Sequence, residues 1–336
     1  MRPAISLASR FCIAILLLAC LSGVPGSHAQ DSLNSLVPPT PPPPPGQTAP
    51  GHVLKSNVDL VVLHVTVADA EGQLVPDLHE DSFRVFENNV EQKVSFFSRA
   101  DIPVTMGLVI DNSASMREKR AQVNAAALTF VRTSNPQDEA FVVNFNDEYY
   151  LDTEHDFTSD INELNDALSR IEARAGTALY DAVIGSLGHI KKGHKDKRVL
   201  LIVTDGEDNL SRNSFEETIH AAQQSSATIY AVGVFSEEDL KHDKKEVRHA
   251  KKALTELAEA TGGQAYFPPT LDEVTPTCER VAREIRSQYT LGYYPTNTAK
   301  DGTFRTVRVQ VQSHHGKVSV RSRAGYYAPA APASAD

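Results

Sequence analysis

The chain has 336 residues, of which 41% are hydrophobic and 23% are charged, enough for one large domain or two ordinary ones. Its formal net charge is −10 at pH 7, and an acidic balance argues against nucleic acid as the partner. Of its three cysteines only Cys278 lies outside the N-terminal 20 residues, so a chain that loses its N-terminus has no disulfide framework of its own.

The N-terminus has the pattern of an export signal. Arg2 and Arg10 form a positive region, residues 11–24 are apolar, and Ser27-His28-Ala29 resembles a cleavage site. We therefore expect a signal peptide over residues 1–29. Its removal takes the net charge from −10 to −12, because it holds two arginines and no acidic residue. No later stretch reaches the roughly 18 apolar residues of a spanning helix, so none is expected in the mature chain.

A second signal overlaps the first. Leu17-Leu18-Ala19-Cys20 resembles a bacterial lipobox, which would make Cys20 the lipid-anchored first residue. Either signal predicts an exported protein, periplasmic or extracellular, with a lipid anchor as the open alternative. Residues 30–54 follow, and their run of prolines from Pro41 to Pro45 predicts an extended, disordered linker.

Residues 55–100 are predicted to be rich in β-strand. Residues 58–67 are mostly Val and Leu, residues 83–86 alternate apolar and polar side chains, and residues 93–97 form a further short strand. Turn residues separate these stretches, and none has helical periodicity over any length. The segment therefore predicts a small antiparallel β unit.

The pattern changes after Pro103 to strands that alternate with helices. Strands are predicted at residues 104–110, 140–145, 149–151 (an edge strand), 199–203, 228–234 and 265–267. Helices are predicted at residues 117–131, 161–171, 178–190, 215–224, 247–260 and 271–286. This alternation predicts an α/β domain over residues 101–287, with a mostly parallel sheet and helices on both faces.

Residues 288–327 return to strand patterns, at 289–294, 304–311, 317–321 and 325–327. The economical arrangement is one antiparallel β-sandwich built from 55–100 and 288–327, with the α/β domain inserted between them. Two separate β units are the alternative, but each would have little core of its own. The tail, residues 328–336, is expected to be disordered.

Polar residues follow two of the predicted strands directly. Asp111-x-Ser113-x-Ser115 comes after residues 104–110, Asp205 comes after residues 199–203, and Thr177 lies at a loop-to-helix junction. Ligands bind at the carboxyl ends of parallel strands, so these groups can converge if the strands are neighbours. Oxygen donors from three loops suit Mg²⁺, which commonly keeps positions for water or a partner.

This set of residues resembles the metal-ion-dependent adhesion site of the von Willebrand factor type A domain, over roughly residues 101–287. The flanks are similar to bacterial secreted proteins related to that family, at Val85-Phe86-Glu87, Leu291-Gly-Tyr-Tyr-Pro295 and Gly325-Tyr-Tyr327. The resemblance implies a Rossmann-like fold, a protein partner and a bound Mg²⁺, with Mn²⁺ or Ca²⁺ as alternatives. It also implies that the two serines and Thr177 are direct or near-direct ligands, and that the aspartates often act through water.

We interpret the chain as an exported adhesion or scaffold module and not as an enzyme. An ion with an incomplete shell stays electrophilic, so an acidic side chain of a protein ligand can complete its coordination. The chain has no Gly-x-Ser-x-Gly and no His-Glu-x-x-His. A Mg²⁺-dependent hydrolase with the metal as Lewis acid and a purely structural envelope protein remain as alternatives. Taken singly, Asp111 or Asp205 is equally well explained as a helix cap.

Several other polar residues receive a simpler interpretation. Asp181, Glu207 and Asp208 lie near the motif in the sequence and are expected to be solvated. His314 and His315 lie in a polar turn and are interpreted as surface residues without a convincing ligand partner. Cys278 lies in an amphipathic helix pattern and is expected to be a small buried apolar residue.

Overall fold

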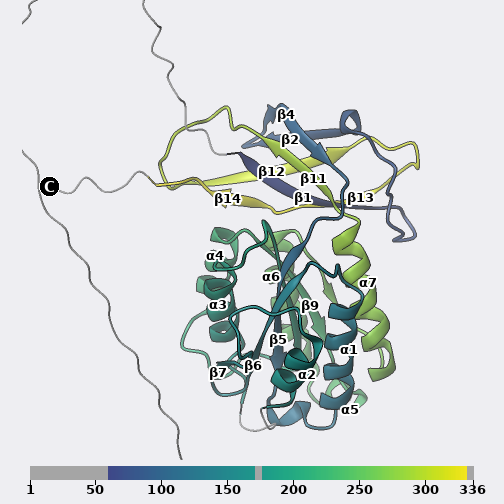
Figure 1. The fold of residues 1–336 in the computed structure, drawn as a ribbon, viewed down its shortest axis with the longest axis vertical. Helices are drawn as coiled ribbons and strands as arrows, with labels where there is room; N and C mark the ends of the chain where they lie inside the picture. The colour runs from purple at the N-terminus through teal and green to yellow at the C-terminus, as the bar shows by residue number, and fades with distance from the viewer. Residues whose placement is uncertain (1–59, 171–175, 331–336) are drawn as a thin grey trace, which may run out of the picture. The chain divides into compact units, whose positions relative to one another are not determined.

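The computed structural model describes residues 60–170 and 176–330. The predicted signal peptide with Cys20, the predicted linker, residues 55–59 and residues 331–336 lie outside this range. None of the helices in the described part of the chain is long and apolar enough to cross a membrane. Strands in the described part form three sheets, one of six strands and two of four (Figure 1).

The central sheet has the strand order β10-β9-β8-β5-β6-β7. Its strands are β5 (Val104–Asp111), β6 (Glu139–Phe145), β7 (Tyr149–Leu151), β8 (Lys197–Thr204), β9 (Ala227–Gly233) and β10 (Ala265–Tyr266). All neighbouring pairs in it are parallel except β6 and β7. The predicted α/β class is therefore confirmed, and β7 is an edge strand as expected.

Helices cover both faces of this sheet (Figure 1). Side chains of α1, α2 and α7 share one core cluster with the sheet, and side chains of α3, α4 and α6 share another. These helices are α1 (Arg120–Arg132), α2 (Ile161–Ser169), α3 (Leu179–Ile190), α4 (Phe215–Gln224), α6 (Lys244–Thr261) and α7 (Val274–Arg286). Alternate residues of β5 face opposite clusters, with Leu108 in the first and Val109 in the second, which is the period of a strand buried on both sides.

Some helices begin at other residues than those predicted from the sequence. The helix predicted from residue 117 begins at Arg120, because the short 3₁₀ helix η2 (Ala114–Met116) and a turn come first. The last helix begins at Val274, after η3 (Leu271–Glu273). Helix α5 (Glu237–His242) was not predicted at all. It has only six residues, too few for a hydrophobic periodicity to be recognised.

The two four-stranded sheets combine strands from both ends of the described chain. Their orders are β13-β1-β11-β4 and β14-β12-β2-β3. The strands are β1 (Val61–Ala68), β2 (Phe83–Glu87), β3 (Val90–Gln92), β4 (Val94–Ser98), β11 (Tyr289–Tyr293), β12 (Phe304–Val311), β13 (Ser319–Arg321) and β14 (Gly325–Tyr327). In one such pair, β1 runs antiparallel to β11 with Val65 opposite Tyr289.

The two sheets bury one shared core. Leu63 and Leu291 from the first sheet and Val85 and Val307 from the second lie in a single hydrophobic cluster. This is the predicted sandwich of flanking segments around an inserted α/β unit. The expected disordered tail needs one correction, because the Ala328 amide donates to the Thr303 carbonyl over 2.9 Å.

A buried carboxylate connects the sandwich to the α/β part. Glu284 of α7 accepts hydrogen bonds from Tyr230 of β9 at 2.9 Å and Tyr266 of β10 at 2.7 Å. It also accepts from Thr66 of β1 at 3.2 Å and pairs with Arg321 of β13 at 2.6 Å. A buried charge is tolerated when it is paired and hydrogen-bonded in this way.

Candidate metal centre

Parallel strand pairing brings Asp111 and Asp205 to the same edge of the central sheet. Asp111 is the last residue of β5, and Asp205 follows directly after β8. The two strands are in register with Ile110 opposite Val203, so they end at the same level. The Thr204 hydroxyl, at the end of β8, donates to Asp111 Oδ2 over 2.5 Å. Both aspartates are buried.

The turn after β5 carries the two serines. The Ser113 amide donates to Asp111 Oδ1 over 2.7 Å, which fixes the start of the turn. Ser113 is the N-cap of η2 and Ser115 lies within it, and their hydroxyl oxygens are 3.1 Å apart. The Ser115 hydroxyl then donates to Asp205 Oδ1 over 2.8 Å. Four of the five predicted site residues therefore form one connected network.

The environment of Asp111 favours a cation. Burial, followed by the negative charge of Asp205, raises the pKa of Asp111 from 3.8 to about 6, against the opposing hydrogen bonds from Thr204 and Ser113. Two buried carboxylates in one site repel each other, and a positive charge between them relieves that repulsion.

Thr177 reaches the same edge from the loop before α3. It is buried, and it lies close to Gly206. A Cβ atom placed at Gly206 would be 3.4 Å from Thr177 Oγ1. Its amide donates to Asn209 Oδ1 over 2.9 Å, and its carbonyl accepts from the amides of Asn209 and Leu210. These bonds join the Thr177 loop to the loop after β8, so Thr177 lies beside the residue that follows Asp205.

A lysine that sequence reasoning missed lies inside this network. Lys119, which is 6% exposed, forms ion pairs with Asp205 Oδ2 and, at 3.0 Å, with Asp239 Oδ2. Asp239 belongs to the unpredicted helix α5, where it completes a capping box with Ser236. The spacing Ser236-x-x-Asp239 is a helix-start pattern, so the start of α5 could have been predicted from the sequence. The contact between Asp239 and Lys119 could not have been predicted in this way.

The acidic residues expected to be solvated hold the loop after β8 in place. Asp181 accepts from the amides of Arg212 and Asn213, each at 3.0 Å. Asp208 accepts from the Tyr180 amide at 3.0 Å and from the Ser211 hydroxyl at 2.5 Å. For these two the expectation was wrong, because their carboxylates satisfy loop amides next to the site.

Residues 106–207, which span Asp111 to Asp205, match the family model of the von Willebrand factor type A domain. The chain contains a von Willebrand factor type A (VWA) domain. The family predicted from the motif is therefore the one found. No curated protein matches the chain.

Several solved structures are similar to the chain. The vWF domain of the type V pili tip protein Mfa5 from Porphyromonas gingivalis has a TM-score of 0.46 and 14% identity, over 55% of this chain and 95% of that one. A von Willebrand factor type A protein from Catenulispora acidiphila has a TM-score of 0.47 and 12% identity, over 83% and 76%. The PilB minor pilin from Streptococcus sanguinis has a TM-score of 0.44 and 12% identity, over 56% and 63%.

The donors of this VWA domain fit a hard divalent cation. Asp111, Ser113, Ser115 and Asp205 offer only oxygen atoms, which Mg²⁺ prefers over nitrogen or sulfur. The ammonium group of Lys119 lies against Asp205, so the site already attracts positive charge. Asp111, Asp205 and Asp239 with Lys119 carry a formal charge of −3 + 1 = −2, which one divalent ion would balance.

Proposed function

We propose that this protein is an exported module that binds another protein through a divalent cation, Mg²⁺ or one of its substitutes Mn²⁺ and Ca²⁺. Asp111, Ser113, Ser115, Thr177 and Asp205 would hold the ion. The observation that carries the proposal is the hydrogen-bonded chain from Asp111 through the two serines to Asp205. This chain supports the proposal because it links oxygen atoms that follow two neighbouring strand ends.

The same donors explain why the partner would contribute an acidic group. Hydroxyl oxygens carry no net charge, so only the two aspartates neutralise the ion, and Asp239 cancels the charge of Lys119. The ion would thus be balanced but not fully coordinated. A carboxylate from a partner can then take an open position, replacing a bound water.

Export and domain organisation belong to the same proposal. The signal-like sequence over residues 1–29, with Cys20 as a lipid-anchor site, supports a periplasmic or extracellular location. We propose that residues 101–287 are the VWA domain and that residues 55–100 and 288–327 form the sandwich that carries it. The Pro-rich residues 30–54 would then space this body from the export signal or anchor.

Calorimetry with Mg²⁺ and Mn²⁺ tests the metal site. We expect binding by the wild type and at least about tenfold weaker binding by Ser115→Ala, which loses a donor oxygen, and by Asp205→Asn, which loses a negative charge. Ser95→Ala is the matched control, since its exposed hydroxyl on β4 bonds the Lys93 carbonyl and none of the predicted donors. Equal metal affinity in the wild type and Asp205→Asn would exclude the site.

Affinity capture tests the partner. A wild-type bait should retain an envelope protein in Mg²⁺ and release it in EDTA, and an Asp205→Asn bait should retain none. If the amount of captured protein changed neither with EDTA nor with the substitution, the purely structural alternative would be favoured instead.

One observation favours the hydrolase alternative. His249 of α6 lies 3.4 Å from Glu207, two residues after Asp205, so an imidazole that could act as a general base lies close to the loop after β8. Turnover of phosphoesters that both chelation and His249→Ala abolish would establish this activity and displace the binding proposal.

A further inference from the structure

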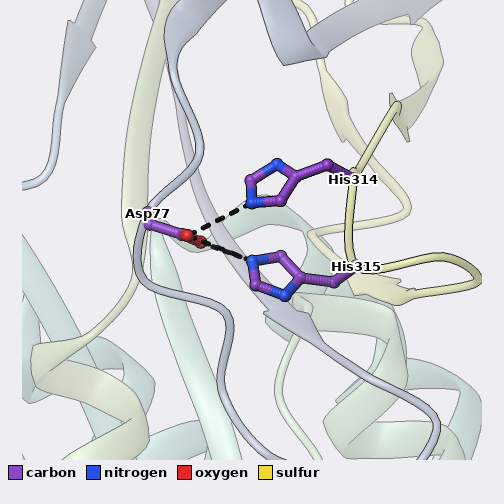
Figure 2. Close-up of side chains that lie close together, drawn as sticks. All are labelled: Asp77, His314 and His315. Atoms are coloured by element: carbon purple, nitrogen blue, oxygen red, sulfur yellow. Dashed lines mark hydrogen bonds and ion pairs between the residues drawn. The ribbon is translucent and has the colours of Figure 1, made fainter.

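Two histidines and an aspartate meet at the exposed surface of the sandwich (Figure 2). Asp77 lies in the loop between β1 and η1 (Glu80–Ser82), and His314 and His315 lie in the turn between β12 and β13. Although 238 positions separate Asp77 from His315, His315 Nε2 lies 2.9 and 3.1 Å from the two oxygens of Asp77. His314 Nε2 lies 3.3 Å from Oδ2.

The spacing of these atoms suits a single metal ion. Both histidines direct the same nitrogen, Nε2, toward the carboxylate (Figure 2), and the three donor atoms lie within 4.8 Å of one another. Ligands bound to one tetrahedral Zn²⁺ at about 2.0–2.2 Å lie roughly 3.3–3.5 Å from each other. The carboxylate-to-imidazole distances of 2.9–3.3 Å therefore need little rearrangement.

The backbone on both sides of the cluster is held in place. The buried Tyr289 hydroxyl donates to the Val75 carbonyl at 2.6 Å and accepts from the Leu78 amide at 3.0 Å, which fixes the chain on either side of Asp77. The His315 amide donates to the Ser313 hydroxyl at 3.0 Å, and Gly316 takes a φ of 83° in the same turn. A pre-positioned backbone lowers the ordering cost of binding.

Among the described residues this is the one group of three His, Cys, Asp or Glu side chains with metal-binding spacing. Other histidines face a single carboxylate, as His155 faces Glu163 and His249 faces Glu207. A pair of this kind is an ordinary surface ion pair, whereas at Asp77 two imidazoles converge on one carboxylate.

We propose that Asp77, His314 and His315 form a second metal site, which binds Zn²⁺ or a chemically similar transition-metal ion such as Cu²⁺ or Ni²⁺. Two nitrogens and one carboxylate oxygen are the donors these ions prefer, unlike the all-oxygen set of the VWA domain. All three side chains are at least 39% exposed, so a fourth position stays open to water. The ion would also link the loop between β1 and η1 to the turn between β12 and β13, which come from the N-terminal and C-terminal segments of the sandwich.

Calorimetry with ZnCl₂ tests this site, on untagged protein because a polyhistidine tag would bind the ion itself. Excess Mg²⁺ in the buffer keeps hard-cation sites saturated. We expect one Zn²⁺ per chain, and affinity at least about tenfold weaker in Asp77→Asn, His314→Ala and His315→Ala. His155→Ala, which removes an exposed histidine that faces only Glu163, is the matched control and should bind Zn²⁺ like the wild type.

Two further measurements keep the result interpretable. Circular dichroism should show that each exposed-residue variant folds like the wild type. The visible absorption of added Co²⁺ should have the intensity of a four-coordinate ion in the wild type and lose it in His314→Ala. Zn²⁺ affinity that is the same in wild type and all three cluster variants, or no Zn²⁺ binding at all, would overturn the proposal, and neither result bears on the Mg²⁺ site.

Discussion

The aspartate site of the VWA domain and the histidine cluster of the sandwich bring donors together in different ways. Asp111 and Asp205 are buried at the ends of neighbouring parallel strands, whereas Asp77 and His315 lie on exposed loops. In a parallel sheet every strand ends at the same edge, so polar residues after strands collect there. Antiparallel strands end at both edges, so a cluster depends on which loops happen to be neighbours.

The two regions also differ in the charged groups that surround their carboxylates. The aspartate site contains its own cation, Lys119, which a metal ion bound there would have to tolerate or displace. No lysine or arginine pairs with Asp77 in the described part of the chain, where its partners are the two imidazoles. An internal counter-ion stabilises the metal-free protein but competes with the metal. The following substitutions test how far the two regions are independent and how much these local charges matter.

The largest effect is expected at the junction of the two regions, from Glu284→Ala. This change leaves Arg321, Tyr230 and Tyr266 without their shared buried acceptor. Removing one partner of a buried pair costs about 3–5 kcal/mol of unfolding free energy. Urea denaturation followed by circular dichroism measures this, since the chain has no tryptophan.

Glu279→Ala is the matched control for that change. It lies on the same helix and makes an exposed 3.8 Å pair with Arg283, so its loss should change stability by less than about 1 kcal/mol. If Glu284→Ala behaved like Glu279→Ala, the junction would not hold the two regions together.

A smaller effect is expected from Lys119→Met, which makes the aspartate site resemble the histidine cluster by removing its internal cation. A divalent ion and an ammonium group that share Asp205 repel each other by several kcal/mol at an effective dielectric constant of about 20. Most of that is avoided if Lys119 moves toward Asp239. We expect Mg²⁺ affinity by calorimetry to rise about tenfold, or ~1.4 kcal/mol.

Lys119→Met should not change the Zn²⁺ affinity. As a control, Lys241→Met removes an exposed lysine paired with Glu237 on α5 and should change neither the Mg²⁺ affinity nor the Zn²⁺ affinity. Weaker Mg²⁺ binding by Lys119→Met would mean that the lysine assembles the site and does not compete for it.

The smallest effect concerns pH and His64 of β1. Burial, together with the positive charges of Lys197 and Arg323, lowers the pKa of His64 from 6.5 to about 3. The unfolded chain therefore takes up a proton below pH 6.5 that the folded chain does not, so stability falls as the pH drops from 6.5 toward 3. Allowing for partial solvent access, we expect His64 to account for about 1 kcal/mol of the loss between pH 7 and pH 5.

Denaturation of His64→Gln at both pH values measures this contribution, and its stability should fall less with acid than that of the wild type. Thr290→Val removes the 3.3 Å contact to His64 Nδ1 but no titrating group, so its pH dependence should match the wild type. An unchanged pH slope in His64→Gln would assign the acid sensitivity to other groups.

Local patterns in the sequence were sufficient for the fold class. The buried strand over 104–110, the alternation of strands and helices, and the return to strands after residue 288 each depend on neighbours in the chain, and β5, β7 and β12 lie where they were predicted. The family followed from a resemblance carried by Asp111, Ser113, Ser115, Thr177 and Asp205. Asp111 and Asp205 could be expected to lie close together because neighbouring parallel strands end at the same edge of a sheet. Metal binding by these residues stays a prediction.

Contacts between distant residues were decided by tertiary structure alone. Lys119 meets Asp239 across 120 positions, and Asp77 meets His315 across 238. The sequence marked His314 and His315 correctly as surface residues but could not supply their partner. Hydrophobic periodicity and turn chemistry act over a few residues, whereas these charges meet only because helices and loops pack at fixed positions on the sheets. Such packing is a property of the whole fold, which no local pattern encodes.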